Sequence, residues 1–269
     1  VVEASPLRAV IRVVRRFNDS VFTQDITLER NSRTLDFRTT VDWHEKQKVL
    51  KAAFPVDVRN RNVSCEIAHG SAEYPTHYNT SYDLAKFEFC AHKWADLSDG
   101  GYGVSILNDC KYGYNVHDNV MKITLLRGPI LPDPVGDIGM HSFRYSFYPH
   151  AGTWRDADTV RLGFEENIRL DGEFIKANGG SDIGHTFAKI DGDSVILDAV
   201  KPAQDGNGVI VRMYESETRH CKVKVWFDLG YSKVIECNLM ECDEHEIPCK
   251  NGEFEFAMRP HEVKTFRLI

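Results

Sequence analysis

Apolar and polar residues alternate with a period of two along much of this chain. Leu35–Trp43 reads LDFRTTVDW, and the same alternation recurs in Phe143–Phe147, Cys221–Phe227 and Phe254–Met258. A period of two is typical of a β-strand that has one buried face and one solvated face. The sequence therefore predicts strands at these four places.

Further strands are expected where β-branched and apolar residues cluster. These are Ala9–Val14, Val21–Leu28, Phe87–Trp94, Val104–Leu107, Val120–Leu126 and Val209–Tyr214. Turn signals such as Asp99-Gly100-Gly101 and Asn251-Gly252 separate them. Many short strands between such turns indicate an all-β sandwich.

Two departures from this pattern are expected. Asp156–Asn167 is the best candidate for a short helix. Pro129–Pro149 begins with several prolines and glycines, which predicts a long loop. Long loops on a β scaffold often have a function, and a simple spacer is the alternative.

A domain boundary is expected near Val200-Lys201-Pro202. The length of 269 residues allows one large β domain or two smaller domains. A broad β region precedes this point, and several short strands follow it. We therefore expect one domain over residues 1–200 and a second over residues 201–269.

The charge and the cysteine content limit the partners and the compartment. The net charge of −7 argues against a nucleic acid partner, which usually requires a basic face. No apolar run is long enough to span a bilayer, so no membrane partner is expected. The seven cysteines are an odd number, so at least one is free. A reducing compartment, and hence the cytoplasm, is the simpler expectation.

Four metal-ligating residues lie close together near the C-terminus: Cys237, Cys242, His245 and Cys249. Structural zinc sites usually place two cysteines two to four residues apart. The spacing here, Cys-x4-Cys-x2-His-x3-Cys, is irregular for such a site. Cysteines that simply occupy strands and turns are the preferred interpretation, and no metal ligand is assigned.

Three segments carry a resemblance to a known family. They are Leu107–Tyr114 (LNDCKYGY), which follows the run CAHKWADLSDGGYGVSIL from Cys90, then Leu125–Pro134 (LLRGPILPDP) and Phe147–Trp154 (FYPHAGTW). Together they resemble the C-terminal β-domain region of glycoside hydrolase family 38 α-mannosidases, in the cytosolic and bacterial branch. The resemblance extends from about Arg30 to Ile269.

The resemblance implies a fold and an activity for the parent protein. The implied fold is a large antiparallel two-sheet supersandwich, similar to galactose mutarotase, followed by a small terminal β-sandwich. The implied parent is a retaining α-mannosidase that hydrolyses terminal α-D-mannose residues from oligosaccharides. In the family, the nucleophile and the zinc ligands lie on an N-terminal barrel, whose motifs do not occur in this chain.

The resemblance thus assigns no catalytic residue and no cofactor to this chain, and it implies zinc for the parent enzyme. The expected partners are the catalytic barrel of the same chain and a mannose-containing oligosaccharide, with a homo-oligomer also possible. By itself, this portion is expected to be inactive. It would pack on the barrel and shape the rim of the active site.

Four residues are candidates for this rim. The segment Glu73–Asp83 (EYPTHYNTSYD) contains His77, Asn79 and Tyr82. Sugar sites combine aromatic faces with groups that donate and accept hydrogen bonds. In the Golgi branch of the family a basic residue near this region helps to hold the substrate, and His77 is the nearest equivalent. Lys111 is the fourth candidate. A loop that only packs on the barrel is the alternative.

Other conspicuous residues have simpler interpretations. Gly113 is expected to satisfy a turn that needs a permissive backbone. His141 and His150 flank an aromatic strand and are expected to be structural histidines.

Two other function classes stay open at this point. One is a stand-alone carbohydrate-binding β-sandwich without catalysis. The other is an aldose-epimerase-type enzyme on the same supersandwich, which would need a catalytic His and Glu pair. Composition does not separate them, because one fold hosts many functions.

Overall fold

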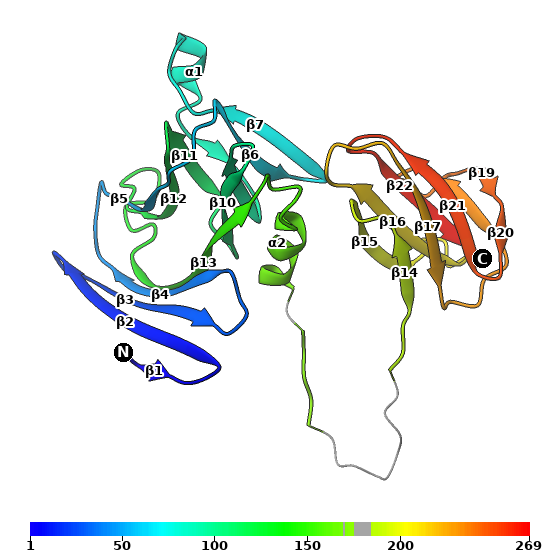
Figure 1. Ribbon diagram of the computed structural model, residues 1–269, viewed down its shortest axis with the longest axis horizontal. Helices are drawn as coiled ribbons and strands as arrows, with labels where there is room; N and C mark the ends of the chain where they lie inside the picture. The colour runs from blue at the N-terminus through cyan, green and yellow to red at the C-terminus, as the bar shows by residue number, and fades with distance from the viewer. Residues whose placement is uncertain (169, 175–183) are drawn as a thin grey trace. The chain divides into compact units, whose positions relative to one another are not determined.

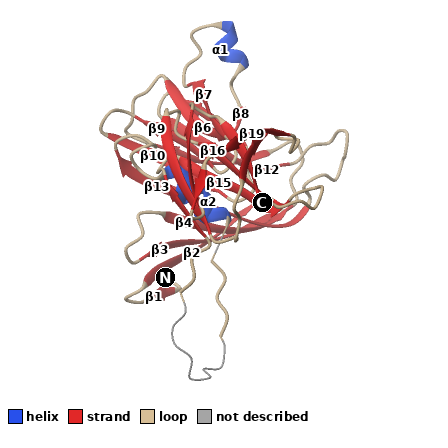
Figure 2. Cartoon of the chain, turned by 90° about the vertical axis from the view of Figure 1, so that its right-hand side faces the viewer, coloured by secondary structure: helices blue, strands red, loops and turns tan. Residues whose placement is uncertain are grey.

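The structure is a computed structural model that describes residues 1–168, 170–174 and 184–269. These residues form twenty-two strands and two short helices, which confirms the all-β class (Figure 1, Figure 2). The chain divides into two compact units. The first unit comprises Val1–Ile67 and Ala72–Leu170, and the second comprises Ala68–Ser71 and Asp171–Ile269.

The first unit contains a nine-stranded antiparallel sheet with the order β1-β2-β3-β4-β13-β10-β9-β6-β7. Its strands are β1 (Glu3–Ala4), β2 (Arg8–Phe17), β3 (Ser20–Glu29), β4 (Leu35–Trp43), β6 (Asn62–Ile67), β7 (Gly70–Pro75), β9 (Trp94–Ser98), β10 (Tyr102–Asn108) and β13 (Gly139–Ala151). A second sheet, with the order β5-β12-β11-β8, has only four strands. These are β5 (Val49–Pro55), β8 (Phe89–Cys90), β11 (Gly113–His117) and β12 (Val120–Arg127).

The core of the first unit lies between these two sheets. Val41 and Ile106 come from the larger sheet, Met121 and Ile123 come from the smaller one, and all four are fully buried in one apolar cluster. Phe37 and Tyr145 stack with ring centroids 5.0 Å apart within the same cluster. The predicted two-sheet sandwich is therefore confirmed.

The second unit is a smaller sandwich of two sheets, with the orders β14-β17-β21-β20 and β15-β16-β22-β18-β19. Its strands are β14 (Ala188–Asp191), β15 (Val195–Pro202), β16 (Val209–Glu215), β17 (Cys221–Phe227), β18 (Val234–Cys237), β19 (Asp243–Ile247), β20 (Cys249–Lys250), β21 (Glu253–Met258) and β22 (Val263–Leu268). Its core contains Val211 and Phe266 from one sheet and Val223 and Phe254 from the other. This unit is the expected terminal β-sandwich.

The two units divide at a different place from the expected boundary. Residues Val200-Lys201-Pro202 lie inside β15, and β15 pairs along its length with β16. Backbone pairing therefore keeps β15 in the second unit, and the division falls between Leu170 and Asp171.

The helices differ in part from those expected. Helix α2 (Thr159–Asn167) starts three residues later than the predicted Asp156, because Asp158 adopts a left-handed conformation with φ of 54°. Helix α1 (Ser81–Ala85) was not predicted. Its signal was present in the sequence, since Thr80 and Asp83 form a reciprocal capping box. No described helix has the length and apolar character needed to cross a membrane.

Two strand predictions need correction. The loop expected over Pro129–Pro149 ends at Ile138, because Gly139–Ala151 forms β13 between β4 and β10. Phe87–Trp94 is not one strand. Its residues divide between β8, which pairs with β11 of the smaller sheet, and β9, which pairs with β10 of the larger sheet. The chain passes from one sheet to the other between them.

A buried polar network ties α2 to the larger sheet. The Asp96 carboxylate accepts hydrogen bonds from Ser105 Oγ and from His150 Nε2, both at 2.7 Å. Ser105 Oγ also lies 2.9 Å from Thr159 Oγ1 at the start of α2. All four residues are buried, and His150 is structural, as expected. His141 is also engaged, with its Nε2 donating to the Asp137 carbonyl at 2.7 Å.

The cysteines are all free thiols in the structure. Burial raises the pKa of Cys65 to about 12, and burial raises that of Cys237 to about 11. Cys90 and Cys242 are exposed. Because the thiolate is the reactive species, these two pairs should differ strongly in reactivity.

Replacing Asp96 by alanine should destabilise the protein by about 3–5 kcal/mol, because His150 and Ser105 lose their buried acceptor. Asp42 offers a matched control, since it forms an exposed pair with His44 at 2.8 Å. Asp42→Ala should cost at most about 1 kcal/mol. Urea denaturation of both variants measures the difference. Equal losses would show that the buried network does not stabilise the fold.

Thiol titration should separate the buried cysteines from the exposed ones. In the folded protein near pH 8, Cys90 and Cys242 should react rapidly with a disulfide reagent, whereas Cys65 and Cys237 should not. After denaturation without reductant, all seven cysteines should react. The Cys65→Ala variant should keep the full rapid phase. A lower count in the denatured protein would reveal a disulfide and contradict the prediction.

Candidate functional site

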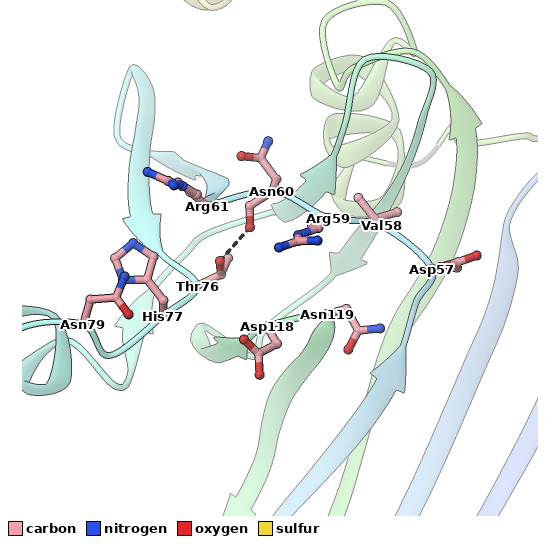
Figure 3. A pocket seen from close by; sticks show the side chains of 10 residues that line it. All are labelled: Asp57, Val58, Arg59, Asn60, Arg61, Thr76, His77, Asn79, Asp118 and Asn119. Carbon is pink, nitrogen blue, oxygen red and sulfur yellow. Dashed lines mark hydrogen bonds between the residues drawn. The ribbon is translucent and has the colours of Figure 1, made fainter.

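A polar cavity of about 910 Å³ lies at one end of the first unit (Figure 3). Three connections surround it: the β5–β6 segment, the segment after β7, and the tight turn between β11 and β12. Its lining residues are Asp57, Val58, Arg59, Asn60, Arg61, Thr76, His77, Asn79, Asp118 and Asn119. These connections join strands of both sheets, so the cavity lies among loops at an end of the sandwich.

Thr76 holds the three segments together. Its Oγ1 donates to the Asn60 carbonyl at 2.7 Å, and its backbone N–H donates to the Arg61 carbonyl at 2.9 Å. Its own carbonyl accepts from the Asp118 backbone N–H at 2.7 Å. Thr76 is only 3% exposed, so these bonds are shielded from water. The relative positions of the cavity walls therefore depend on this residue.

Two further contacts fix the β5–β6 segment. Val58 is buried in the core of the first unit, whereas its neighbours Asp57 and Arg59 are exposed. Asn119 Nδ2 donates to the Val56 carbonyl at 2.7 Å, and the Val56 N–H donates back to the Asn119 carbonyl at 2.9 Å. An apolar anchor within a polar sequence thus turns the charged side chains outward.

The cavity combines charges of both signs with amide groups. Arg59 and Arg61 both line the cavity, and each supplies a guanidinium group that can donate hydrogen bonds. Asp57 and Asp118 supply carboxylate acceptors. His77 Nδ1 lies 3.6 Å from Asp83 Oδ2. Donors and acceptors in this mixture suit a neutral ligand with many hydroxyl groups.

The structure brings together two of the four rim candidates. His77 and Asn79 line the same cavity. Tyr82 lies on α1, is 81% exposed and is not among the lining residues. Lys111 does not line the cavity either, and its Nζ lies 4.6 Å from the centre of the Phe143 ring. That cation–π contact accounts for Lys111 without a sugar.

Sequence reasoning missed the arginines of this cavity. The Glu73–Asp83 segment contains no arginine, but in the structure Arg59 and Arg61, from a segment that precedes β6, line the same cavity as His77. The run DVRNRN over residues 57–62 was the available signal, because charged and amide residues cluster there directly after a strand. The turn residues Asp118 and Asn119 had no comparable signal.

The LNDCKYGY motif has a structural explanation. Asn108 is fully buried, and its Nδ2 donates to the His92 carbonyl at 2.6 Å and to Tyr114 Oη at 2.7 Å. Its Oδ1 accepts from the Lys111 N–H at 2.7 Å. Gly113 is the first residue of β11 and has no positive φ, so the expected turn strain is absent there. A Cβ at Gly113 would instead lie 3.3 Å from Thr124 on the paired strand.

The cysteine cluster near the C-terminus occupies strands and a turn. Cys237 ends β18, Cys249 begins β20, and Cys242 lies between β18 and β19. Within the described residues, no group of three or more His, Cys, Asp or Glu side chains is arranged to hold a metal ion.

Two family descriptions match the chain. Residues 1–135 match the glycosyl hydrolases family 38 C-terminal domain, and residues 194–266 match the glycosyl hydrolases family 38 C-terminal beta sandwich domain. The two matches do not overlap, and the second, to a beta sandwich domain, falls within the smaller sandwich of the second unit. The chain therefore belongs to glycoside hydrolase family 38.

Several curated relatives are similar over most of the chain. Alpha-mannosidase G of Dictyostelium discoideum is 36% identical over 100% of the chain and 26% of its own length. Alpha-mannosidase 2C1 of Homo sapiens is 32% identical over 93% of the chain and 24% of its own length. The alpha-mannosidase of Saccharomyces cerevisiae is 37% identical over 87% of the chain and 24% of its own length. The chain thus spans about a quarter of these relatives.

A solved structure shares the fold. An alpha-mannosidase from Enterococcus faecalis V583 superposes with a TM-score of 0.82 at 17% identity, and the match covers 100% of the chain and 34% of that structure. At this identity the likeness supports the architecture.

Proposed function

We propose that this chain is the C-terminal part of a longer retaining α-mannosidase that removes terminal α-D-mannose from oligosaccharides. The observation that carries the proposal is the pair of family matches, since both describe C-terminal regions of family 38 hydrolases. Relatives at 32–37% identity are named alpha-mannosidases, which supports the substrate class. The chain covers only a quarter of their length, so the rest of the parent supplies the remaining machinery.

The reaction itself is assigned to the preceding part of the parent. A retaining glycosidase needs two carboxyl groups about 5–5.5 Å apart, one as nucleophile and one as acid/base. We assign these carboxyls and the zinc site to the catalytic barrel, since the family resemblance places them there. The described residues of this chain offer no metal-ligand group of their own.

The role proposed for this chain is to form part of the active-site rim with its polar cavity. Arg59, Arg61 and the amide of Asn79 would donate hydrogen bonds to sugar hydroxyls, and Asp118 would accept them. Groups held on a rigid scaffold can orient a bound sugar without losing much of their own freedom. The Thr76 hydrogen bonds supply that rigidity in this chain.

A cytoplasmic location is also proposed for the parent. Seven free cysteines, four of them with pKa values raised by burial, suit a reducing compartment.

Removing cavity side chains from the full-length parent should weaken substrate binding. Arg59→Ala and His77→Ala should each raise KM or lower kcat/KM, and a tenfold loss corresponds to about 1.4 kcal/mol of transition-state stabilisation. Arg161→Ala is the control, because this arginine is exposed on α2 outside the cavity. Steady-state kinetics on an α-mannoside, with thermal unfolding to check the fold, give the answer. Unchanged kinetics in both cavity variants would leave the cavity without a role in substrate binding.

Residues 1–269 alone should have no mannosidase activity, whereas the full-length parent should turn over a chromogenic α-mannoside in the presence of zinc. A β-rich circular dichroism spectrum of the shorter protein would establish that it is folded. Turnover by residues 1–269 would place catalysis in this chain. Mannose binding without any turnover by the parent would instead favour a carbohydrate-binding protein.

A further inference from the structure

The two sheets of the first unit differ greatly in width. The larger sheet has nine strands and the smaller one has four. Strand register shows which side chains face the core. Ile11 pairs with Ile26, and Ile26 pairs with Phe37, so the three share one face of the larger sheet. Phe37 is a core residue, which identifies this face as the inner one.

The inner face of the larger sheet becomes more exposed to solvent from β4 toward β2. Phe37 on β4 is 9% exposed, whereas Ile11 on β2 is 51% exposed. Phe17 and Leu28 lie on the same face by the alternation of their strands, and each is about half exposed, at 48% and 49%. Large apolar side chains left exposed on one face of a sheet are typical of a contact site.

A groove of about 670 Å³ lies between this inner face and β5. Its apolar lining includes Val13, Phe17, Phe22, Trp43, Leu50 and Phe54. Trp43 Nε1 is buried and has no hydrogen-bond acceptor among the described residues. The groove wall is thus largely apolar, and one of its residues contains a buried donor without an acceptor.

The edge of β5 that borders the groove is free. β5 is the terminal strand of the smaller sheet and pairs only with β12 in the described structure. A free edge presents unpaired backbone N–H and C=O groups that can bind another strand. Arg15 and Lys48 also line the groove, which gives it a basic rim.

We propose that an extended segment of the parent chain, from the part that precedes residue 1, pairs with β5 and covers the inner face of β2 and β3. Apolar side chains at alternate positions of this segment would pack on Ile11 and Phe17, and carboxylates would lie opposite Arg15 and Lys48. The smaller sheet thereby gains at least one strand.

Three observations favour this occupant over a second copy. The matched families are C-terminal regions, and the relatives are about four times as long, so most of the parent precedes this chain. β1 pairs with β2, so residues joined to Val1 begin at the edge of the larger sheet next to the strand that carries Ile11 and Phe17. The basic rim would repel the same basic rim on a second copy. The proposal rests on membership of the family and not on the catalytic assignment.

Site-specific photo-cross-linking in the full-length parent tests this inference. p-Benzoylphenylalanine in place of Ile11 lies on the uncovered inner face, and in place of Val14 it lies on the opposite face of the same strand. Val14 is 59% exposed, so the two positions are matched in accessibility. The Ile11 position should cross-link to peptides that precede residue 1 of the same molecule. Cross-links to another molecule, cross-links only to peptides within residues 1–269, or no product at all would overturn the proposal.

The thermal stability of variants at the same two positions, Ile11 and Val14, gives an independent test. Ile11→Asp should lower the Tm of the full-length parent by at least about 2–4 °C, whereas Val14→Asp should leave it nearly unchanged. Hydrogen exchange should also show the β5 amides as protected as those of β12. Equal Tm values for the two variants, together with rapid exchange along β5, would show that the groove is open in the parent. Because these readouts do not involve turnover, their failure is distinct from a failure of the proposed activity.

Discussion

Apolar packing between the nine-stranded and four-stranded sheets is the interaction on which the first unit depends. Side chains such as Val41, Ile106, Met121 and Ile123 are removed from water entirely, and each contributes roughly 1.5–3 kcal/mol relative to an exposed position. Strand register assigns these residues to the inner face, and a slip of one residue would turn them to solvent. The polar features of the unit are consequences of this arrangement, because every loop begins and ends on strands that the core holds fixed.

The polar cavity shows how the core controls the arrangement of surface loops. Val58 is buried in the core, and this fixes the path of the β5–β6 segment so that Arg59 faces outward. Thr76 then joins that segment to the β11–β12 turn through buried hydrogen bonds. An unmade hydrogen bond in such a buried position costs about 1–3 kcal/mol, so the three segments are held in one arrangement. Loops that carry binding residues are commonly positioned by a rigid scaffold of this kind.

The sequence was most informative where a pattern is local. Alternation identified β4, β17 and β21 because each strand buries one face, and the family motifs identified the two-sandwich architecture. It was least informative where partners are distant in the chain. β15 belongs to the second unit because it pairs with β16. β8 and β9 are separate strands because β8 pairs with β11 of the smaller sheet, whereas β9 pairs with β10 of the larger sheet. The lining of the polar cavity was predicted only in part for the same reason. His77 and Asn79 were found from local composition, whereas Arg59 and Asp118 reach them only through the fold.

The uncovered inner face has a consequence for how the parent folds. Ile11, Phe17 and Leu28 are each about half exposed, and burial of side chains of this kind is a main source of folding free energy. If a preceding segment of the chain buries them, part of the stability of the C-terminal region belongs to the intact enzyme and not to this region alone. The cavity loops leave strands of the same sandwich, including β5, whose free edge borders the groove. Pairing at that edge would therefore restrict the β5–β6 segment that bears Arg59 and Arg61, and it would couple the packing of the parent to the geometry of the polar cavity.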